Sequence, residues 1–120
     1  MRCLIVDDNA AFLEAAATLL EREGVTVVGV ASNTEDALRQ VQELQPDVVL
    51  VDIMLGPENG FDLARRLAED DGRAAVILVS THAEADFADL IADTPAAGFV
   101  PKLELSADAI RRLANASRER

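Results

Sequence analysis

Short apolar runs and helical segments alternate five times along this chain of 120 residues. Most of the runs consist of Val, Ile and Leu without polar alternation, which is typical of strands buried on both faces. The runs are Arg2–Val6, Val25–Val30, Val48–Val51, Ala75–Val79 and Gly98–Val100. Because a helical segment follows each run, the pattern predicts a parallel sheet with helices on both faces.

The helical segments repeat apolar residues at intervals of three and four positions and begin at capping residues. Candidate N-caps precede the first, second and last segments at Asn9, Asn33 and Ser106. Ser32 and Glu35 form an alternative capping box for the second segment. The apolar faces comprise Phe12, Ala15, Ala16, Leu19 and Leu20; Ala37, Leu38, Val41 and Leu44; Phe61, Leu63, Ala64 and Leu67; Phe87, Leu90 and Ile91; and Ala109, Ile110, Leu113 and Ala114.

We therefore expect an α/β fold of the flavodoxin-like, doubly wound type, with a five-stranded parallel sheet in the order 2-1-3-4-5. Residues 1–120 are expected to form a single domain, since this length is close to the commonest domain size. Right-handed crossovers would bring the carboxyl ends of all five strands to one edge of the sheet. Residues that directly follow the strands are therefore the candidates for function.

Charge and hydropathy narrow the possible partners. The formal net charge of -11, from 22 acidic and 11 basic residues, disfavours direct binding to nucleic acid or to an anionic membrane surface. No apolar run is long enough to span a bilayer and no cleavable signal pattern is present, so we expect a cytoplasmic protein. The one cysteine, Cys3, lies in the first apolar run and is interpreted as a small buried hydrophobic residue.

Reactive side chains follow four of the five strands: Asp7 and Asp8 the first, Asp52 the third, Ser80 the fourth and Lys102 the fifth. Singly, each has an ordinary interpretation, because such acids often cap turns and a lysine is often a solvated surface charge. Together, three carboxylates would repel one another and favour a bound cation, for which oxygen ligands indicate Mg²⁺. A carboxylate can also attack phosphorus to give an aspartyl phosphate, with Mg²⁺, Lys102 and the Ser80 hydroxyl neutralising and positioning the phosphoryl group.

From about Arg2 to Ala116 the sequence resembles a receiver domain of the two-component response regulators. The resemblance is carried by Val-Asp-Asp at 6–8, by Asp52 with Gly60 eight residues later, by Ser80, and by Gly-Phe-Val-Pro-Lys at 98–102. It implies a signalling domain that is phosphorylated by a histidine kinase or phosphotransfer protein. Such a domain is not an enzyme with an external substrate, and its chemistry is limited to self-phosphorylation and self-dephosphorylation.

The resemblance also implies a role for each residue of the acidic cluster. Asp52 would be the phosphoacceptor, and Lys102 would pair with a phosphoryl oxygen. Asp8, Asp52 and the backbone carbonyl of Met54 would hold Mg²⁺, with Asp7 acting through a bound water.

A conformational switch is implied as well. Ser80 would turn toward the phosphoryl group and Phe99 would turn inward behind it. The change would be read on the surface of helix four, strand five and helix five, by a downstream protein or in a homodimer. The weak periodicity of the fourth helical segment, about Glu84–Ala92, suits an element that shifts.

Three departures from the family pattern concern the same edge of the sheet. Leu103 follows Lys102 where the family commonly has proline, and Pro101 precedes it. The loop after Asp52 reads Leu-Gly-Pro-Glu-Asn-Gly, and Ser80 stands where threonine is common. We expect the backbone of the loops after the third and fifth strands to differ from the common conformation of the family.

By the same resemblance, Met54 and His82 would flank the path of the water that hydrolyses the aspartyl phosphate. An apolar Met54 cannot orient that water, so we expect slow self-dephosphorylation. His82 could donate a hydrogen bond to the phosphoryl group or simply lie in solvent, and both interpretations stay open.

Two other functions compete with a phosphorylation-activated switch as explanations of these residues. A Mg²⁺-dependent phosphohydrolase of the haloacid dehalogenase type would need a second acid two residues after the first, but position 9 is Asn. A receiver-like docking scaffold without phosphorylation would not need the complete set of acids, hydroxyl and lysine. Nucleotide binding has no support, because there is no Gly-rich phosphate loop. The domain could act alone or be part of a longer regulator with a DNA-binding domain.

Overall fold

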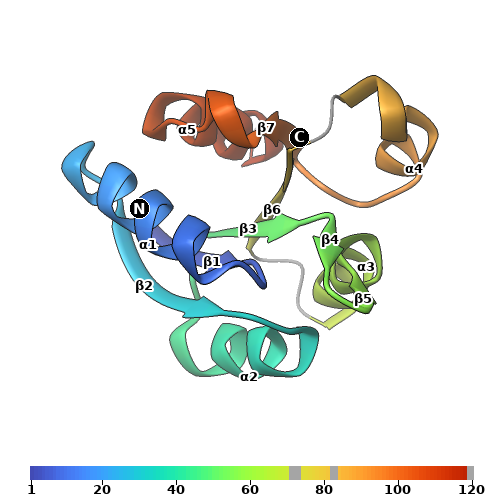
Figure 1. Cartoon of the computed structure of the whole chain (residues 1–120), viewed down its shortest axis with the longest axis horizontal. Helices are drawn as coiled ribbons and strands as arrows, with labels where there is room; N and C mark the ends of the chain where they lie inside the picture. The colour runs from blue at the N-terminus through green and yellow to red at the C-terminus, as the bar shows by residue number, and fades with distance from the viewer. Residues whose placement is uncertain (71–73, 82–83, 119–120) are drawn as a thin grey trace.

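A five-stranded parallel sheet forms the centre of the protein, as a computed structural model of residues 1–70, 74–81 and 84–118 describes it. In Figure 1 the strand order is β2-β1-β3-β6-β7. With β6 and β7 as the fourth and fifth long strands, this is the predicted order 2-1-3-4-5. The strands are β1 (Arg2–Val6), β2 (Thr26–Ala31), β3 (Val48–Asp52), β6 (Ala75–Ser80) and β7 (Gly98–Pro101).

Helices cover both faces of this sheet. One face packs against α1 and α5, and the other packs against α2 and α3 with η1 and α4 beside them (Figure 1). The flavodoxin-like, doubly wound α/β fold is thereby confirmed. The helices are α1 (Ala10–Arg22), α2 (Thr34–Leu44), α3 (Gly60–Asp70), the 3₁₀ helix η1 (Glu84–Phe87), α4 (Ala88–Ala92), the 3₁₀ turn η2 (Lys102–Glu104) and α5 (Ala107–Arg118).

Alternate residues of the same strands build two separate cores. In β3, Val48 and Leu50 belong to the core under α1 and α5, whereas Val49 and Val51 belong to the core under α2 and α3. All four are fully buried. The strands read as continuous apolar runs because neighbouring side chains point to opposite faces and both faces are covered.

The predicted caps start the helices as expected. The Asn9 side chain accepts a hydrogen bond from the Phe12 amide at 3.1 Å, and the Ser106 hydroxyl accepts one from the Ala109 amide at 3.1 Å. For α2 the structure selects Asn33 over the Ser32 capping box, since the Asn33 side chain accepts from the Asp36 amide at 2.8 Å. Each cap satisfies one backbone donor that the helix itself cannot pair.

The segment after β3 differs from the simple loop that the sequence predicts. It forms a short antiparallel hairpin, in which β4 (Met54–Leu55) pairs with β5 (Glu58–Asn59). Gly56 in the turn has a φ of 60°, a conformation that is costly for residues with a Cβ. A carboxyl oxygen of Glu58 accepts from the Thr34 amide at the start of α2 at 2.8 Å, so a contact distant in sequence holds the hairpin.

The fourth helical segment is also less regular than predicted. Its first four residues form the 3₁₀ helix η1, and only the five residues of α4 are α-helical. The Thr94 hydroxyl donates to the Leu90 carbonyl at 2.6 Å, and Pro95 follows directly. The sequence Asp70-Asp71-Gly72 predicts a turn after the third helical segment, and its last two residues lie outside the described residues. None of the helices that the structure describes has the length and apolar character to cross a bilayer.

Cys3 provides a chemical test of this packing. It is fully buried in β1, and burial raises the pKa of its thiol to about 12. Since the thiolate is the reactive form, we expect a disulfide reagent such as DTNB to label native protein at least on the order of a thousandfold more slowly than protein in guanidinium. Released thionitrobenzoate measures the rate, and rapid stoichiometric labelling in native buffer would contradict this packing.

Candidate phosphoryl-transfer site

The ends of four strands position the predicted site residues at one edge of the sheet, here called the carboxyl edge. Asp7 directly follows β1, and its amide donates to the Ala31 carbonyl of β2 at 3.0 Å. Asp52 is the last residue of β3, Ser80 the last residue of β6, and Lys102 directly follows β7. Parallel pairing fixes these ends side by side, which is why residues far apart in sequence converge there.

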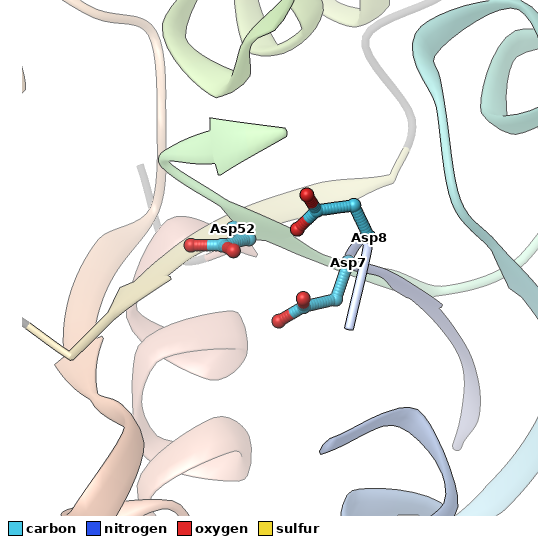
Figure 2. A group of neighbouring side chains, drawn as sticks. All are labelled: Asp7, Asp8 and Asp52. Atoms are coloured by element: carbon cyan, nitrogen blue, oxygen red, sulfur yellow. The ribbon is translucent and has the colours of Figure 1, made fainter. Parts of the chain in front are cut away.

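Asp7, Asp8 and Asp52 form a compact carboxylate cluster at this edge (Figure 2). One carboxylate oxygen from each residue lies within 4.8 Å of those of the other two. Asp7 and Asp52 are buried and Asp8 is exposed, so the cluster has one side open to solvent. The sequence prediction that the three acids meet is therefore matched by their positions.

Lys102 lies between the two buried acids. Its Nζ is 2.6 Å from Asp7 Oδ2 and 3.4 Å from Asp52 Oδ2. The Lys102 side chain is only 12% exposed, and that of Asp7 is completely buried. Ion pairs removed from water in this way are strongly coupled, because loss of one partner leaves the other charge buried and unbalanced.

The pKa of Asp52 reflects this environment. Burial, followed by the neighbouring charge of Asp7, raises the pKa of Asp52 from 3.8 to about 6. Lys102 and the Met54 amide, which donates to Asp52 Oδ1 at 3.3 Å, act in the opposite direction. Asp52 is therefore mostly ionised at neutral pH, although burial and the charge of Asp7 oppose its ionisation.

Glycine at two positions lets the backbone approach the cluster closely. A Cβ on Gly60 would lie 2.1 Å from the backbone oxygen of Asp52, so only glycine fits where α3 begins. A Cβ on Gly56 would lie 3.3 Å from an Asp8 carboxylate oxygen, which places the β4–β5 turn beside the cluster. The spacing of Asp52 and Gly60 in the sequence therefore has a steric cause at the site.

The structure describes three of the four other predicted residues, Ser80, Phe99 and Met54. Ser80 is buried at the end of β6, the strand that pairs with β3. Phe99 in β7 is half-buried against the core under α2 and α3. The Met54 side chain is 55% exposed on the hairpin, and His82 lies outside the described residues.

Sequence reasoning missed two contacts made by residues it had assigned to helix structure. The Asn9 amide donates to Asp7 Oδ1 at 2.8 Å, so the α1 cap also orients an acid of the cluster. The ring of Phe12 faces the Lys102 ammonium, with Nζ 4.3 Å from the ring centroid. No signal in the helical pattern distinguishes Phe12 from an ordinary core residue.

The carboxylate cluster fits a divalent cation by charge and by ligand type. Three carboxylates and one ammonium leave two negative charges uncompensated when all the acids are ionised. The ligand atoms are oxygens, which Mg²⁺ prefers, and the exposed Asp8 side would leave room for the waters that Mg²⁺ retains. Burial and the neighbouring charge of Asp7 raise the pKa of Asp52, and a bound divalent cation would act in the opposite direction.

Comparison with known proteins gives the class to which this fold and site belong. A profile of the response regulator receiver domain matches residues 3–114. The chain belongs to this family, whose members are phosphorylation-activated signalling domains of two-component systems rather than enzymes with external substrates.

Individual relatives agree with this assignment. The DNA-binding response regulator MtrA of Mycobacterium tuberculosis is 40% identical over 79 residues, which cover 66% of this chain and 34% of MtrA. The chain thus spans about a third of the length of that relative. A LuxR-family two-component response regulator from Aurantimonas superposes with a TM-score of 0.86 at 29% identity, covering 96% of this chain and 85% of the other. A response regulator receiver domain protein from Clostridium thermocellum gives 0.82 at 27% identity, with coverages of 98% and 97%.

The raised pKa of Asp52 predicts a pH-dependent stability when EDTA removes divalent ions. Between pH 3.8 and about 6 the folded state binds more protons at Asp52 than the unfolded state does. The contribution of Asp52 to the free energy of unfolding is therefore highest at low pH and falls as pH rises through about 6. We expect Asp52→Asn to gain on the order of 2 kcal/mol relative to wild type between pH 4 and pH 7.5.

Urea unfolding of both proteins across this pH range, in EDTA, measures that difference. Asp108→Asn removes an exposed acid from the first turn of α5 and controls for the loss of one charge. If the difference in free energy of unfolding between Asp52→Asn and wild type stays constant with pH, folding does not raise the pKa of Asp52.

Proposed function

We propose that this domain accepts a phosphoryl group on Asp52 and acts as a phosphorylation-activated switch. The observation that carries the proposal is the Lys102 ammonium shared between Asp7 and Asp52 at the carboxyl edge, next to the exposed Asp8. This set supplies a nucleophile, a fixed positive charge and oxygen ligands within one small site. Residues 1–120 would constitute a single receiver domain.

In the proposed reaction a carboxylate oxygen of Asp52 attacks the phosphorus of a phosphodonor. A new O–P bond forms and the bond between phosphorus and the donor atom breaks, leaving the donor with the electron pair. Lys102 would neutralise charge on the phosphoryl oxygens, and the Ser80 hydroxyl would donate to one of them. Phosphoryl transfer of this kind depends on positioning and charge more than on proton transfer.

Mg²⁺ would supply further charge neutralisation when bound. The residues proposed to hold it are Asp8, Asp52 and the Met54 backbone carbonyl, with Asp7 contributing through water. The fit of the carboxylate cluster to a divalent cation supports this assignment.

The signal would pass from the site through Ser80 and Phe99. Ser80 ends β6, and Phe99 lies within the neighbouring strand β7, where it pairs with Leu78. Phe99 packs against the core under α2 and α3, as Phe87 and Ile91 also do. Reorientation of Phe99 would therefore alter the surface of α4, β7 and α5. Only five residues of α4 are α-helical, so moving it would disrupt few hydrogen bonds.

The partners follow from the same proposal. A histidine kinase or phosphotransfer protein would donate the phosphoryl group in the cytoplasm. A downstream protein or a second copy of the domain would recognise the α4–β7–α5 surface. The acidic net charge of -11 argues against direct nucleic-acid binding by these residues.

Acetyl phosphate with Mg²⁺ tests the phosphoacceptor. We expect intact-mass spectrometry to show one added phosphoryl group on wild type and none on Asp52→Asn, because the amide cannot form an acyl phosphate. EDTA should prevent the addition. Asp62→Asn, which removes an exposed acid from α3, should be modified like wild type.

Other results would favour the competing functions. If Asp52→Asn gained the same phosphoryl group, another residue would be the phosphoacceptor. Multiple turnover of a small phosphoester would favour a phosphohydrolase. A wild-type protein that responds to neither acetyl phosphate nor beryllofluoride would favour a docking scaffold.

Met54 and His82 are proposed to influence the lifetime of the phosphorylated state. The exposed thioether of Met54 has no group that can orient a water, so wild type should dephosphorylate slowly. We expect Met54→Asn to raise the hydrolysis rate about tenfold, because a positioned amide can align the water. Phosphate release after removal of excess acetyl phosphate measures this rate.

Leu103→Asn provides the matched control, since it adds the same amide at another exposed apolar position of this edge. His82→Ala tests the second residue in the same assay. If Met54→Asn and His82→Ala both release phosphate at the wild-type rate, neither residue controls the lifetime.

A further inference from the structure

Lys102 has three contacts of different character at the carboxyl edge. Two are with the charged oxygens of Asp7 and Asp52, and the third is with the face of the Phe12 ring, 4.3 Å from its centroid. A cation at this distance over an aromatic face is attracted by the negative potential of the ring. The attraction is strengthened when the ammonium is largely shielded from water, and Lys102 is 12% exposed.

The two acidic contacts cannot hold Lys102 in the same way throughout the proposed reaction. Asp52 would lose its carboxylate charge when it becomes an acyl phosphate, and a cation at the cluster would compete with Lys102 for the oxygens of Asp7 and Asp52. The Phe12 ring does not change in either event. It also carries no net charge, so it repels an incoming phosphoryl group far less than a third carboxylate would.

Local structure fixes Phe12 relative to the acids. The Asn9 amide donates to Asp7 Oδ1 at 2.8 Å, and the Asn9 side chain accepts from the Phe12 amide at 3.1 Å. One short segment therefore sets the positions of both Asp7 and the first turn of α1. The ring packs against the core under α1 and α5, which restricts its movement.

We propose that Phe12 is a positioning residue, whose ring holds the Lys102 ammonium at the carboxyl edge while the charges of Asp7 and Asp52 are redistributed during phosphoryl transfer. The inference rests on the proposed function, because it assigns Lys102 to the phosphoryl group. It adds a residue whose action is on Lys102 and not on the phosphoryl group itself.

The sole lysine of the chain makes the contact directly observable. Protein labelled with ¹³C-lysine gives one ε-methylene signal, which the Phe12 ring current should shift upfield of its position in the unfolded chain. We expect Phe12→Leu, which keeps an apolar side chain, to move this signal toward the unfolded value. An unchanged signal in Phe12→Leu would overturn the contact.

Fluorination tests the electrostatic character of the contact at nearly constant shape. We would replace Phe12 site-specifically with 4-fluoro- and 3,4,5-trifluorophenylalanine, which progressively weaken the negative potential of the ring. The rate of Asp52 phosphorylation by acetyl phosphate and Mg²⁺ should fall stepwise, by about fivefold at the trifluoro variant. The melting temperature should stay close to that of wild type. If Phe12 had only a structural role, the phosphorylation rate would not fall stepwise while the melting temperature stayed unchanged.

Leu19→Ala controls for truncation of an apolar residue of α1 and should leave the phosphorylation rate unchanged. A phosphorylated wild type with equal rates across the fluorinated series would overturn the role of Phe12 and leave the proposed function standing. A wild type that takes up no phosphoryl group would overturn the proposed function and this inference with it.

Discussion

The ammonium group of Lys102 between Asp7 and Asp52 is the interaction on which the carboxyl edge depends. Its Nζ lies 2.6 Å from one buried carboxylate and 3.4 Å from the other. Without this charge, two acids would face each other in a region with little access to water, which is strongly unfavourable. The chain has no second lysine that could replace it.

The constraint extends from the side chains into the backbone. Asp52 belongs to the parallel ladder of β3 and also supplies the central carboxylate, so the sheet fixes where that charge lies. Gly60 is pressed against the Asp52 backbone oxygen, and α3 starts there and contributes Phe61 and Leu63 to the core. The contact between Asp52 and Gly60 therefore connects the carboxylate cluster to the core under α2 and α3. Packing of this core holds the acids together against their repulsion.

Those parts of the fold that depend on local pattern could be predicted from the sequence. The apolar runs predicted the five long strands, and Asn9 and Ser106 were expected caps. The convergence of Asp7 and Asp52 followed from strand order, because parallel strands end at one edge. The second strand is Thr26–Ala31, one residue later at each end than the predicted Val25–Val30. An apolar pattern alone does not fix strand ends to a single residue.

Features that depend on contacts between distant residues could not be predicted in this way. The β4–β5 hairpin is held where Glu58 meets the Thr34 amide, a contact invisible before the two segments are placed. The contact between Phe12 and Lys102 joins α1 to the end of β7, and the helical pattern assigned Phe12 only to a core. The choice of Asn33 as the α2 cap required its side-chain geometry.

The same electrostatics suggest why such a site suits a reversible switch. Asp52 is held ionised at neutral pH although burial and Asp7 raise its pKa to about 6, so its charge is stored at a cost in the resting fold. In the proposed reaction, a phosphoryl group on Asp52 would replace that charge with a larger one. Lys102 would then divide its attraction between Asp7 and the phosphoryl oxygens. A small chemical change would thereby alter the balance of forces at the ends of β1, β3 and β7 together.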